Sequence, residues 1–167
     1  DVQELNIDSL ALSGHKFYGP KGIGALYVKS GVHFKKYIDG GHQERNKRAG
    51  TENVPAIVGM GKALELAYSD MEEHNKKIKG LRDYYEKRVK EEIDNIQING
   101  NIENRLPGNS NILFENADGE GILLNLDMQG ICASSGSACT SGSLNPSHVL
   151  LAIGVEQELA KNSLRIS

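Results

Sequence analysis

Apolar residues recur every three or four positions over about 40 residues in the middle of the chain, which places them on one face of an α-helix. The stripe comprises Ile57, Met60, Leu64, Ala67, Met71, Ile78, Leu81, Tyr85 and Val89. Asn53 can cap this helix and Pro55 suits its first turn. If straight, the helix would be about 60 Å long, and Gly80 is the expected break. A coiled coil is disfavoured because His74 and Arg88 fall on its seam.

Short apolar segments on both sides of the helix predict strands. Asp118 is the expected cap of one further helix, and Gly154 the expected end of another. The strands are expected at 7–12, 23–28, 96–98, 110–114, 131–133 and 164–166, and the helices at 119–128, 146–153 and 156–161. This alternation predicts an α/β fold with an α+β small domain at its C-terminal end.

The composition excludes several classes of function. The 167 residues suit about one domain with a substantial core. A net charge of −3 gives no electrostatic case for nucleic-acid binding, and no apolar stretch approaches the ~20 residues that span a membrane. Two cysteines without export features favour the reducing cytoplasm. Because the chain starts without methionine and its last predicted strand stops at the end, we expect a piece of a larger protein.

Cys139 lies in a run of residues with very small side chains, residues 133–143. Gly and Ser favour mobile polar loops, so we expect this loop to present a reactive thiol. Cys132, in contrast, is expected to be a core residue of the apolar strand at 131–133. The spacing is not Cys-x-x-Cys and no histidine pair accompanies it, so no metal site is expected.

Lys16 follows Ser13 and His15 at the end of a predicted strand. In an extended segment Ser13 and His15 share one side, where a hydroxyl and an imidazole suit a phosphate, and Lys16 points to the other side. An amine held there against apolar Phe17 could act as a nucleophile, and the alternative is a solvated surface lysine. The glycines of residues 19–24 follow neither the Walker nor the dinucleotide spacing, so we assign them to a tight turn.

Two more polar residues each have two possible roles. Thr51 precedes the long helix, where a hydroxyl can bind an anion, but plain capping by Thr51 or Asn53 explains it equally well. Arg165 lies between Leu164 and Ile166, so on a strand its side chain faces opposite to both. It could form a salt bridge or a bidentate carboxylate site.

Four segments together resemble one family, the pyridoxal-phosphate-dependent cysteine desulfurases of the iron–sulfur-cluster-assembly (nitrogen-fixation) type, within the class V aminotransferases. The segments are the lysine motif Ser13-Gly14-His15-Lys16 with the glycines up to Gly24, the second signature at 40–53, the active-site loop at 134–142 around Cys139, and the arginine strand at 163–167. The resemblance implies the C-terminal part of a fold-type-I pyridoxal-phosphate transferase. It would divide the chain into the tail of the large cofactor domain at 1–53, a long bridging helix at 54–95 and a small domain at 96–167.

The resemblance also implies a role for each candidate residue. Lys16 would hold pyridoxal 5'-phosphate covalently and move the Cα proton of the substrate. Ser13 and His15 would bind the phosphate, and Thr51 would reach the phosphate in the neighbouring subunit of a homodimer. Arg165 would bind the carboxylate of L-cysteine.

Cys139 would attack the substrate sulfur, which leaves a persulfide on Cys139 and releases L-alanine. The loop would then carry the sulfur to an acceptor such as an iron–sulfur scaffold protein. Departures from the family pattern at His42, Asn46 and Lys47 are loop changes from which we expect little effect. Family members also carry a longer N-terminal part, with a histidine that stacks on the cofactor ring and an aspartate that pairs with its nitrogen. The isolated chain is therefore expected to be inactive or nearly so.

Three alternatives remain open at this point. One is a related class V enzyme that acts on selenocysteine or cystine. Another is a plain aminotransferase, against which the Cys139 loop argues. The third is a catalytically inactive, truncated interaction module.

Overall fold

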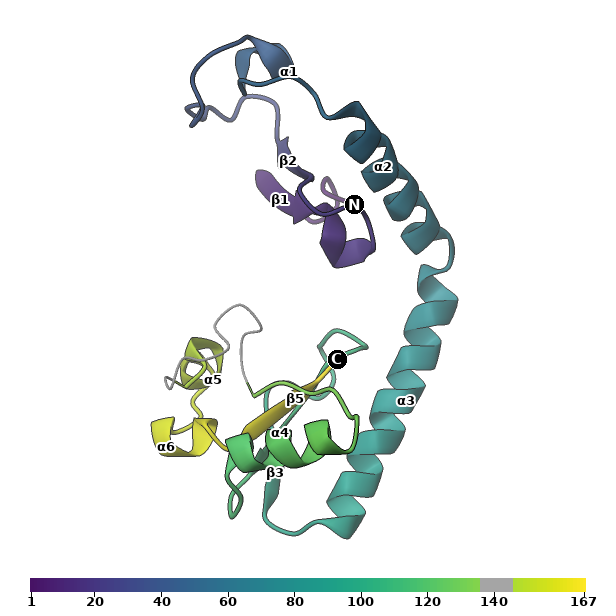
Figure 1. The fold of residues 1–167 in the computed structure, drawn as a ribbon, viewed down its shortest axis with the longest axis vertical. Helices are drawn as coiled ribbons and strands as arrows, with labels where there is room; N and C mark the ends of the chain where they lie inside the picture. The colour runs from purple at the N-terminus through teal and green to yellow at the C-terminus, as the bar shows by residue number, and fades with distance from the viewer. Residues whose placement is uncertain (136–145) are drawn as a thin grey trace. The chain divides into compact units, whose positions relative to one another are not determined.

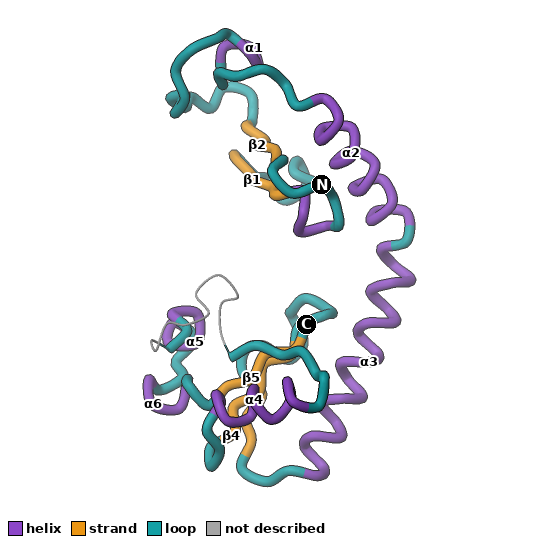
Figure 2. Tube along the Cα trace, viewed as in Figure 1, coloured by secondary structure: helices purple, strands orange, loops and turns teal. Residues whose placement is uncertain are grey.

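The computed structural model describes residues 1–135 and 146–167, which form two compact units. The first unit spans residues 1–71 and the second residues 72–167 (Figure 1). Both mix helices and strands, as Figure 2 shows by colour, so the expected α/β class is confirmed.

A two-stranded antiparallel hairpin forms the centre of the first unit. Strands β1 (Ser9–Ser13) and β2 (Gly24–Val28) pair from Ser9 opposite Val28 to Ser13 opposite Gly24. The expected strands are confirmed, with their ends shifted by one or two residues. A Cβ at Gly24 would overlap the carbonyl oxygen of Leu12, so the close approach of the two strands requires glycine here.

The predicted long helix is two helices, α2 (Val54–Ser69) and α3 (Met71–Glu92). The break lies at Asp70 and not at the expected Gly80, which is inside α3. At the break the Ser69 hydroxyl donates to the Leu66 carbonyl oxygen (2.8 Å) and to Asp70 Oδ1 (3.3 Å). Side chains that bond to nearby backbone compete with helical hydrogen bonds, and the Ser69 hydroxyl does so here. The boundary between the two units falls at the same place.

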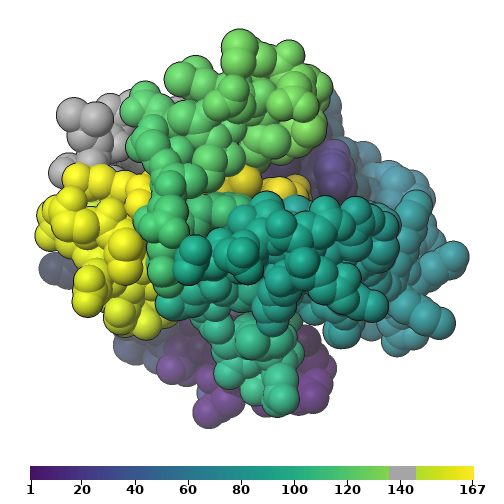
Figure 3. Space-filling view, turned by 90° about the horizontal axis from the view of Figure 1, so that it is seen from below, coloured from purple at the N-terminus to yellow at the C-terminus, as the bar shows by residue number. Residues whose placement is uncertain are grey.

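The second unit is built on a three-stranded antiparallel sheet in the order β3-β4-β5. Its strands are β3 (Ile96–Ile98), β4 (Ser110–Phe114) and β5 (Ser163–Ile166), close to the expected ranges. Helix α4 (Gly119–Met128) begins where expected, because Asp118 Oδ2 accepts from the Gly121 N–H (2.8 Å). The C-terminal helices α5 (His148–Ala152) and α6 (Gln157–Ala160) are shorter than expected, and they form one edge of this unit (yellow in Figure 3).

Helix α3 is attached to the sheet through buried polar groups. Glu86 Oε1 accepts from the Ser110 hydroxyl of β4 (2.8 Å), and its other oxygen forms an ion pair with Arg105. Arg82 Nη1 donates to the Leu106 carbonyl oxygen (3.1 Å). The buried apolar residues of this unit include Ile112, Leu113, Leu150, Ala160 and Leu164. The sheet that carries Arg165 is therefore supported on one face by α3.

Candidate active site

A short lysine turn, residues 14–19, connects β1 to the segment before β2. Lys16 lies in its 3₁₀ helix, η1 (Gly14–Phe17). The Gly14 N–H donates to the Ile23 carbonyl oxygen and the Gly14 carbonyl oxygen accepts from the Gly19 N–H, both at 2.9 Å. A Cβ at the buried Gly14 would lie 2.9 Å from Ile23 Cγ2, so this packing favours glycine. The turn is thus closed at both ends and exposes Lys16.

Ser13, His15 and Lys16 are all exposed, but their backbone is not extended throughout. The predicted alternation is wrong because Gly14–Phe17 form a 3₁₀ helix, in which successive side chains are about 120° apart. None of the three side chains bonds to another residue in the described ranges. A hydroxyl, an imidazole and a primary amine are therefore available within four consecutive residues. This donor set fits the phosphate and aldehyde groups of pyridoxal phosphate.

Asn53, and not Thr51, caps α2. Asn53 Oδ1 accepts from the Ala56 N–H (3.3 Å), whereas the exposed Thr51 side chain has no hydrogen-bond partner among the residues with a described position. The residue before Thr51 is held in place, because Gln43 Oε1 accepts from the Gly50 N–H (3.1 Å) and Gly50 has a left-handed φ of +101°. The capping role thus falls to Asn53, and the Thr51 hydroxyl is available to an anion.

Helix α2 packs against the lysine turn. A Cβ at Gly59 of α2 would lie 2.8 Å from Pro20 Cγ, so glycine permits this close approach. The phosphate-binding candidates Ser13, His15 and Thr51 consequently belong to one compact unit.

Arg165 lies on β5, and its backbone is hydrogen-bonded to Ser134 on one side of the strand. Its backbone N–H donates to the Ser134 carbonyl oxygen (2.6 Å), and its carbonyl oxygen accepts from the Ser134 N–H (3.0 Å). On the other side its partner in β4 is Asn111. The half-buried guanidinium makes no hydrogen bond or ion pair with any described residue, so the salt-bridge alternative is not realised among them. An unpaired guanidinium on a strand suits a bidentate carboxylate.

Of the two cysteines, the structure describes Cys132 and not Cys139. Cys139 falls within residues 136–145, outside the described residues. Cys132 has an exposed free thiol, and residues 131–133 form no strand, so the prediction of a core cysteine is wrong. The physical reason is that the segment pairs with the sheet only at Ser134, so no described strand flanks residues 131–133.

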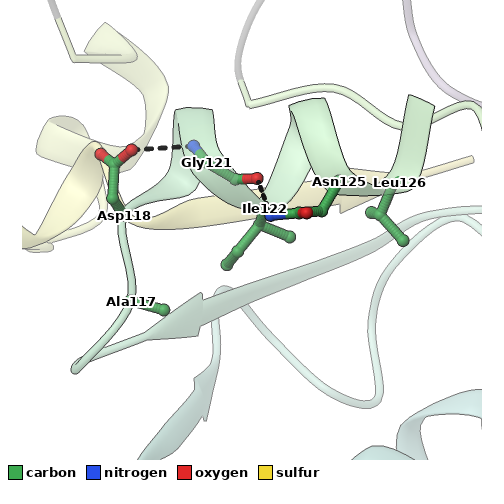
Figure 4. Close-up of a pocket in the computed structure, with 6 residues that line it drawn as sticks. All are labelled: Ala117, Asp118, Gly121, Ile122, Asn125 and Leu126. Carbon is green, nitrogen blue, oxygen red and sulfur yellow. Dashed lines mark hydrogen bonds between the residues drawn. The ribbon is translucent and has the colours of Figure 1, made fainter. Parts of the chain in front are cut away.

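A shallow pocket lies along α4, and its lining includes none of the predicted site residues (Figure 4). Its polar groups are already used within the helix. Asp118 caps Gly121, and Asn125 Nδ2 donates to the Gly121 carbonyl oxygen (2.8 Å), as the dashed lines show. The pocket therefore presents no free acid, base or nucleophile, and we do not assign chemistry to it. Its lining residues are Ala117, Asp118, Gly121, Ile122, Asn125 and Leu126.

The described residues contain neither a candidate metal site nor a candidate membrane span. In residues 1–135 and 146–167, no group of three or more His, Cys, Asp or Glu side chains could hold a metal ion. None of the helices in the same ranges is both long and apolar enough to cross a membrane.

The roles of Gln43 and Ser134 were not predicted from the sequence. Gln43 fixes the residue before Thr51, and Ser134 fixes the backbone of Arg165. Both contacts depend on the folded path of the chain, and neither residue follows a helical or alternating pattern that would mark it. Their positions inside the 40–53 and 134–142 segments were the only available signal.

Comparisons with known proteins agree with the order of these segments. A cysteine desulfurase IscS from Dictyoglomus turgidum is 52% identical over 167 residues, which cover 100% of this chain and 42% of that protein. A cysteine desulfurase from Nostoc sp. is 55% identical over 167 residues, again 100% of this chain and 42% of that protein. The chain thus spans about two fifths of the curated relatives that it matches.

Solved structures give the same result. A NifS-like protein from Rickettsia africae matches with a TM-score of 0.88 and 39% identity, covering 100% of this chain and 43% of that one. A structure described as SspA in complex with cysteine matches with a TM-score of 0.71 and 37% identity, covering 100% of this chain and 45% of that one. These neighbours confirm the expected fold. The whole chain, residues 1–167, also matches the family described as Aminotransferase class-V. The chain therefore belongs to the aminotransferase class-V family.

Proposed function

We propose that the full-length protein containing this chain is a cysteine desulfurase that removes sulfur from L-cysteine. The observation that carries the proposal is the backbone bridge between Arg165 and Ser134. The Arg165 guanidinium, which has no partner among the described residues, suits the substrate carboxylate, and Ser134 comes five residues before Cys139 in the sequence. One contact therefore joins the carboxylate-binding candidate to the segment that carries the nucleophile. The identity of more than half of the residues with named cysteine desulfurases supports the same conclusion.

Four residues of this chain would bind pyridoxal 5'-phosphate. The Lys16 amine would hold it and move the substrate Cα proton. Ser13 and His15 would donate hydrogen bonds to its phosphate, and Thr51 would donate to the phosphate of the cofactor in the other subunit. Their exposure and lack of partners in the described ranges support these roles. When bound, the cofactor supplies an electron sink for negative charge at Cα.

The Cys139 thiolate would attack the substrate sulfur. A sulfur–sulfur bond forms as the Cβ–S bond of L-cysteine breaks, and the bonding electron pair remains with Cβ, which takes a proton to give L-alanine. No external oxidant or reductant is needed, because the sulfur leaves Cβ as a persulfide on Cys139. This persulfide would pass its outer sulfur to an iron–sulfur scaffold protein.

The proposal includes a homodimer, in which Thr51 reaches the phosphate bound by the other subunit. Residues 1–53 would belong to the cofactor domain, 54–95 to a bridging helical segment and 96–167 to the small domain. We place the enzyme in the cytoplasm, where reducing conditions would keep the Cys139 thiol free. The isolated chain would have little or no activity, because the remaining three fifths of its relatives' length holds other parts of such a site.

Cysteine substitutions in the full-length protein test the proposal. With pyridoxal phosphate and L-cysteine, the wild-type protein should release L-alanine and, with a reducing thiol present, sulfide. Cys139→Ser should abolish sulfur transfer and retain cofactor absorbance. Cys132→Ser is the matched control, because Cys132 is exposed and has no assigned role, and it should keep wild-type activity. Wild-type sulfur transfer by Cys139→Ser would refute the persulfide role.

A further inference from the structure

Asn111 and Arg165 lie directly opposite each other on β4 and β5. Arg165 directs both backbone groups to Ser134, and the Asn111 carbonyl oxygen accepts from the Asn99 N–H (2.9 Å) on the far side of β4. The two residues therefore form a non-hydrogen-bonded antiparallel pair. In such a pair the Cα atoms are about 4.5 Å apart and the side chains share one face at their closest spacing. The Asn111 amide is thus a direct neighbour of the Arg165 side chain.

The Asn111 amide is held by its oxygen alone. Asn111 Oδ1 accepts from Asn99 Nδ2 (2.7 Å), and Asn99 Nδ2 also donates to Oγ of the buried Ser163 (3.1 Å). Asn111 Nδ2 has no partner in the described part of the chain. The network therefore fixes the amide and leaves its N–H groups unused beside Arg165.

The face that carries this pair is not the face that α3 covers. Ser110 precedes Asn111, so the two side chains point to opposite faces of β4. The Ser110 hydroxyl donates to Glu86 of α3. Asn111 and Arg165 consequently present their donors on the side of the sheet opposite to α3.

We infer that Asn111 is a second hydrogen-bond donor to the carboxylate that Arg165 binds. The inference rests on the proposed function, in which that carboxylate belongs to L-cysteine. A carboxylate offers about four acceptor positions, and a bidentate arginine occupies two of them. An amide N–H fixed one strand away can occupy a third. Asn111 thereby helps to select substrates that carry a carboxylate.

Binding of two small thiols to the full-length protein with pyridoxal phosphate tests this role. 3-Mercaptopropionate has a carboxylate and no amine, whereas cysteamine has an amine and no carboxylate. Asn111→Ser removes the N–H donors without adding a charge and leaves a hydroxyl on the side chain, and Asn111→Ala removes every polar group. Asn109→Ala is the matched control, because Asn109 is exposed, precedes β4 and makes no hydrogen bond to a described residue.

We expect calorimetry to show that both Asn111 variants raise the Kd for 3-mercaptopropionate about tenfold or more, since hydrogen bonds to charged groups are strong. Their Kd for cysteamine should be unchanged, and Asn109→Ala should bind both ligands as the wild type does. If Asn111→Ala fails to fold, the uncharged Asn111→Ser still decides the question. Equal weakening for both ligands would show a merely structural role and overturn the inference.

Arg165→Ala separates failure of the inference from failure of the proposed function. If Arg165→Ala weakens 3-mercaptopropionate binding and the Asn111 variants do not, the inference is wrong and the proposed substrate site stands. If Arg165→Ala also leaves that Kd unchanged, the proposed substrate site is wrong, and the role of Asn111 falls with it.

Discussion

Arg165 and Ser134 exchange two backbone hydrogen bonds, with N···O distances of 2.6 Å and 3.0 Å. The bridge fixes the point from which the chain continues toward Cys139, five residues later in the sequence. It also fixes the strand position of the guanidinium that we assign to the substrate carboxylate. In the proposed reaction the carboxylate and the attacking thiolate must be positioned together, and this bridge is the described contact that links them.

Breaking the bridge should slow sulfur transfer. Ser134→Pro removes the N–H that donates to Arg165, and the proline ring cannot restore it. Because misplaced reacting groups lose rate steeply, we expect the rate of persulfide formation in the full-length protein to fall about tenfold or more. Cofactor absorbance should be unchanged, since Lys16 is in the other unit. Ser134→Ala also removes the hydroxyl but keeps both backbone hydrogen bonds, so its rate of persulfide formation should be higher than that of Ser134→Pro. A wild-type rate for Ser134→Pro would contradict this account.

Replacing Arg165 with lysine should raise the KM for L-cysteine. Lysine keeps the positive charge but cannot bind a carboxylate through two parallel N–H groups. A rise of about tenfold or more corresponds to the loss of one strong charge-assisted hydrogen bond. Arg88→Lys is the control, because Arg88 pairs with Glu92 on the exposed side of α3. Steady-state kinetics of the full-length protein gives both values, and an unchanged KM for Arg165→Lys would exclude the assigned role.

Local signals in the sequence predicted the elements that depend on neighbouring residues. Asp118 marks the start of α4 because its carboxylate bonds to Gly121, three residues later. The short apolar segments at 96–98 and 110–114 form strands where expected. The four site motifs were also recognisable, because each lies within one short segment.

The predictions that were wrong concern positions where hydrogen bonds compete or where the partner is far away in the sequence. Gly80 stays helical, while the bonds of Ser69 interrupt the helix at Asp70. Cys132 is exposed because pairing with β5 begins only at Ser134. The place of Asn111 beside Arg165 follows from the register of β4 and β5, which join segments far apart in the chain. The periodicity within one segment does not indicate the register in which it pairs with a distant strand.

Removing Glu86 should strongly destabilise the second unit. Glu86 and Arg105 form an ion pair in which both side chains are about nine tenths buried, and Glu86 also accepts from Ser110. Glu86→Ala leaves the Arg105 charge buried without its partner, so we expect the free energy of unfolding to fall by about 3 kcal/mol or more. Glu91→Ala, which removes an exposed pair with Lys87, should cost about 1 kcal/mol or less. Urea unfolding of the full-length protein measures both changes, and equal effects would contradict the structural role of Glu86.

Because of Tyr85 on α3, we expect the free energy of unfolding to fall at alkaline pH. Burial raises the pKa of the half-buried Tyr85 phenol above its usual range, and the nearby Glu86 carboxylate raises this pKa further. The folded state therefore favours the neutral phenol, so its contribution to stability is complete below the unfolded pKa of about 10 and is lost as the pH rises above it.

Phenylalanine cannot ionise. When the pH is raised from about 8 to about 11, the free energy of unfolding of Tyr85→Phe should therefore fall by less than that of the wild type. Tyr37→Phe is the matched control, because it makes the same replacement at a fully exposed tyrosine. Urea unfolding at the two pH values measures the difference. If Tyr85→Phe and Tyr37→Phe lose the same free energy over this interval, ionisation of Tyr85 does not oppose folding, and the alkaline sensitivity must come from another group.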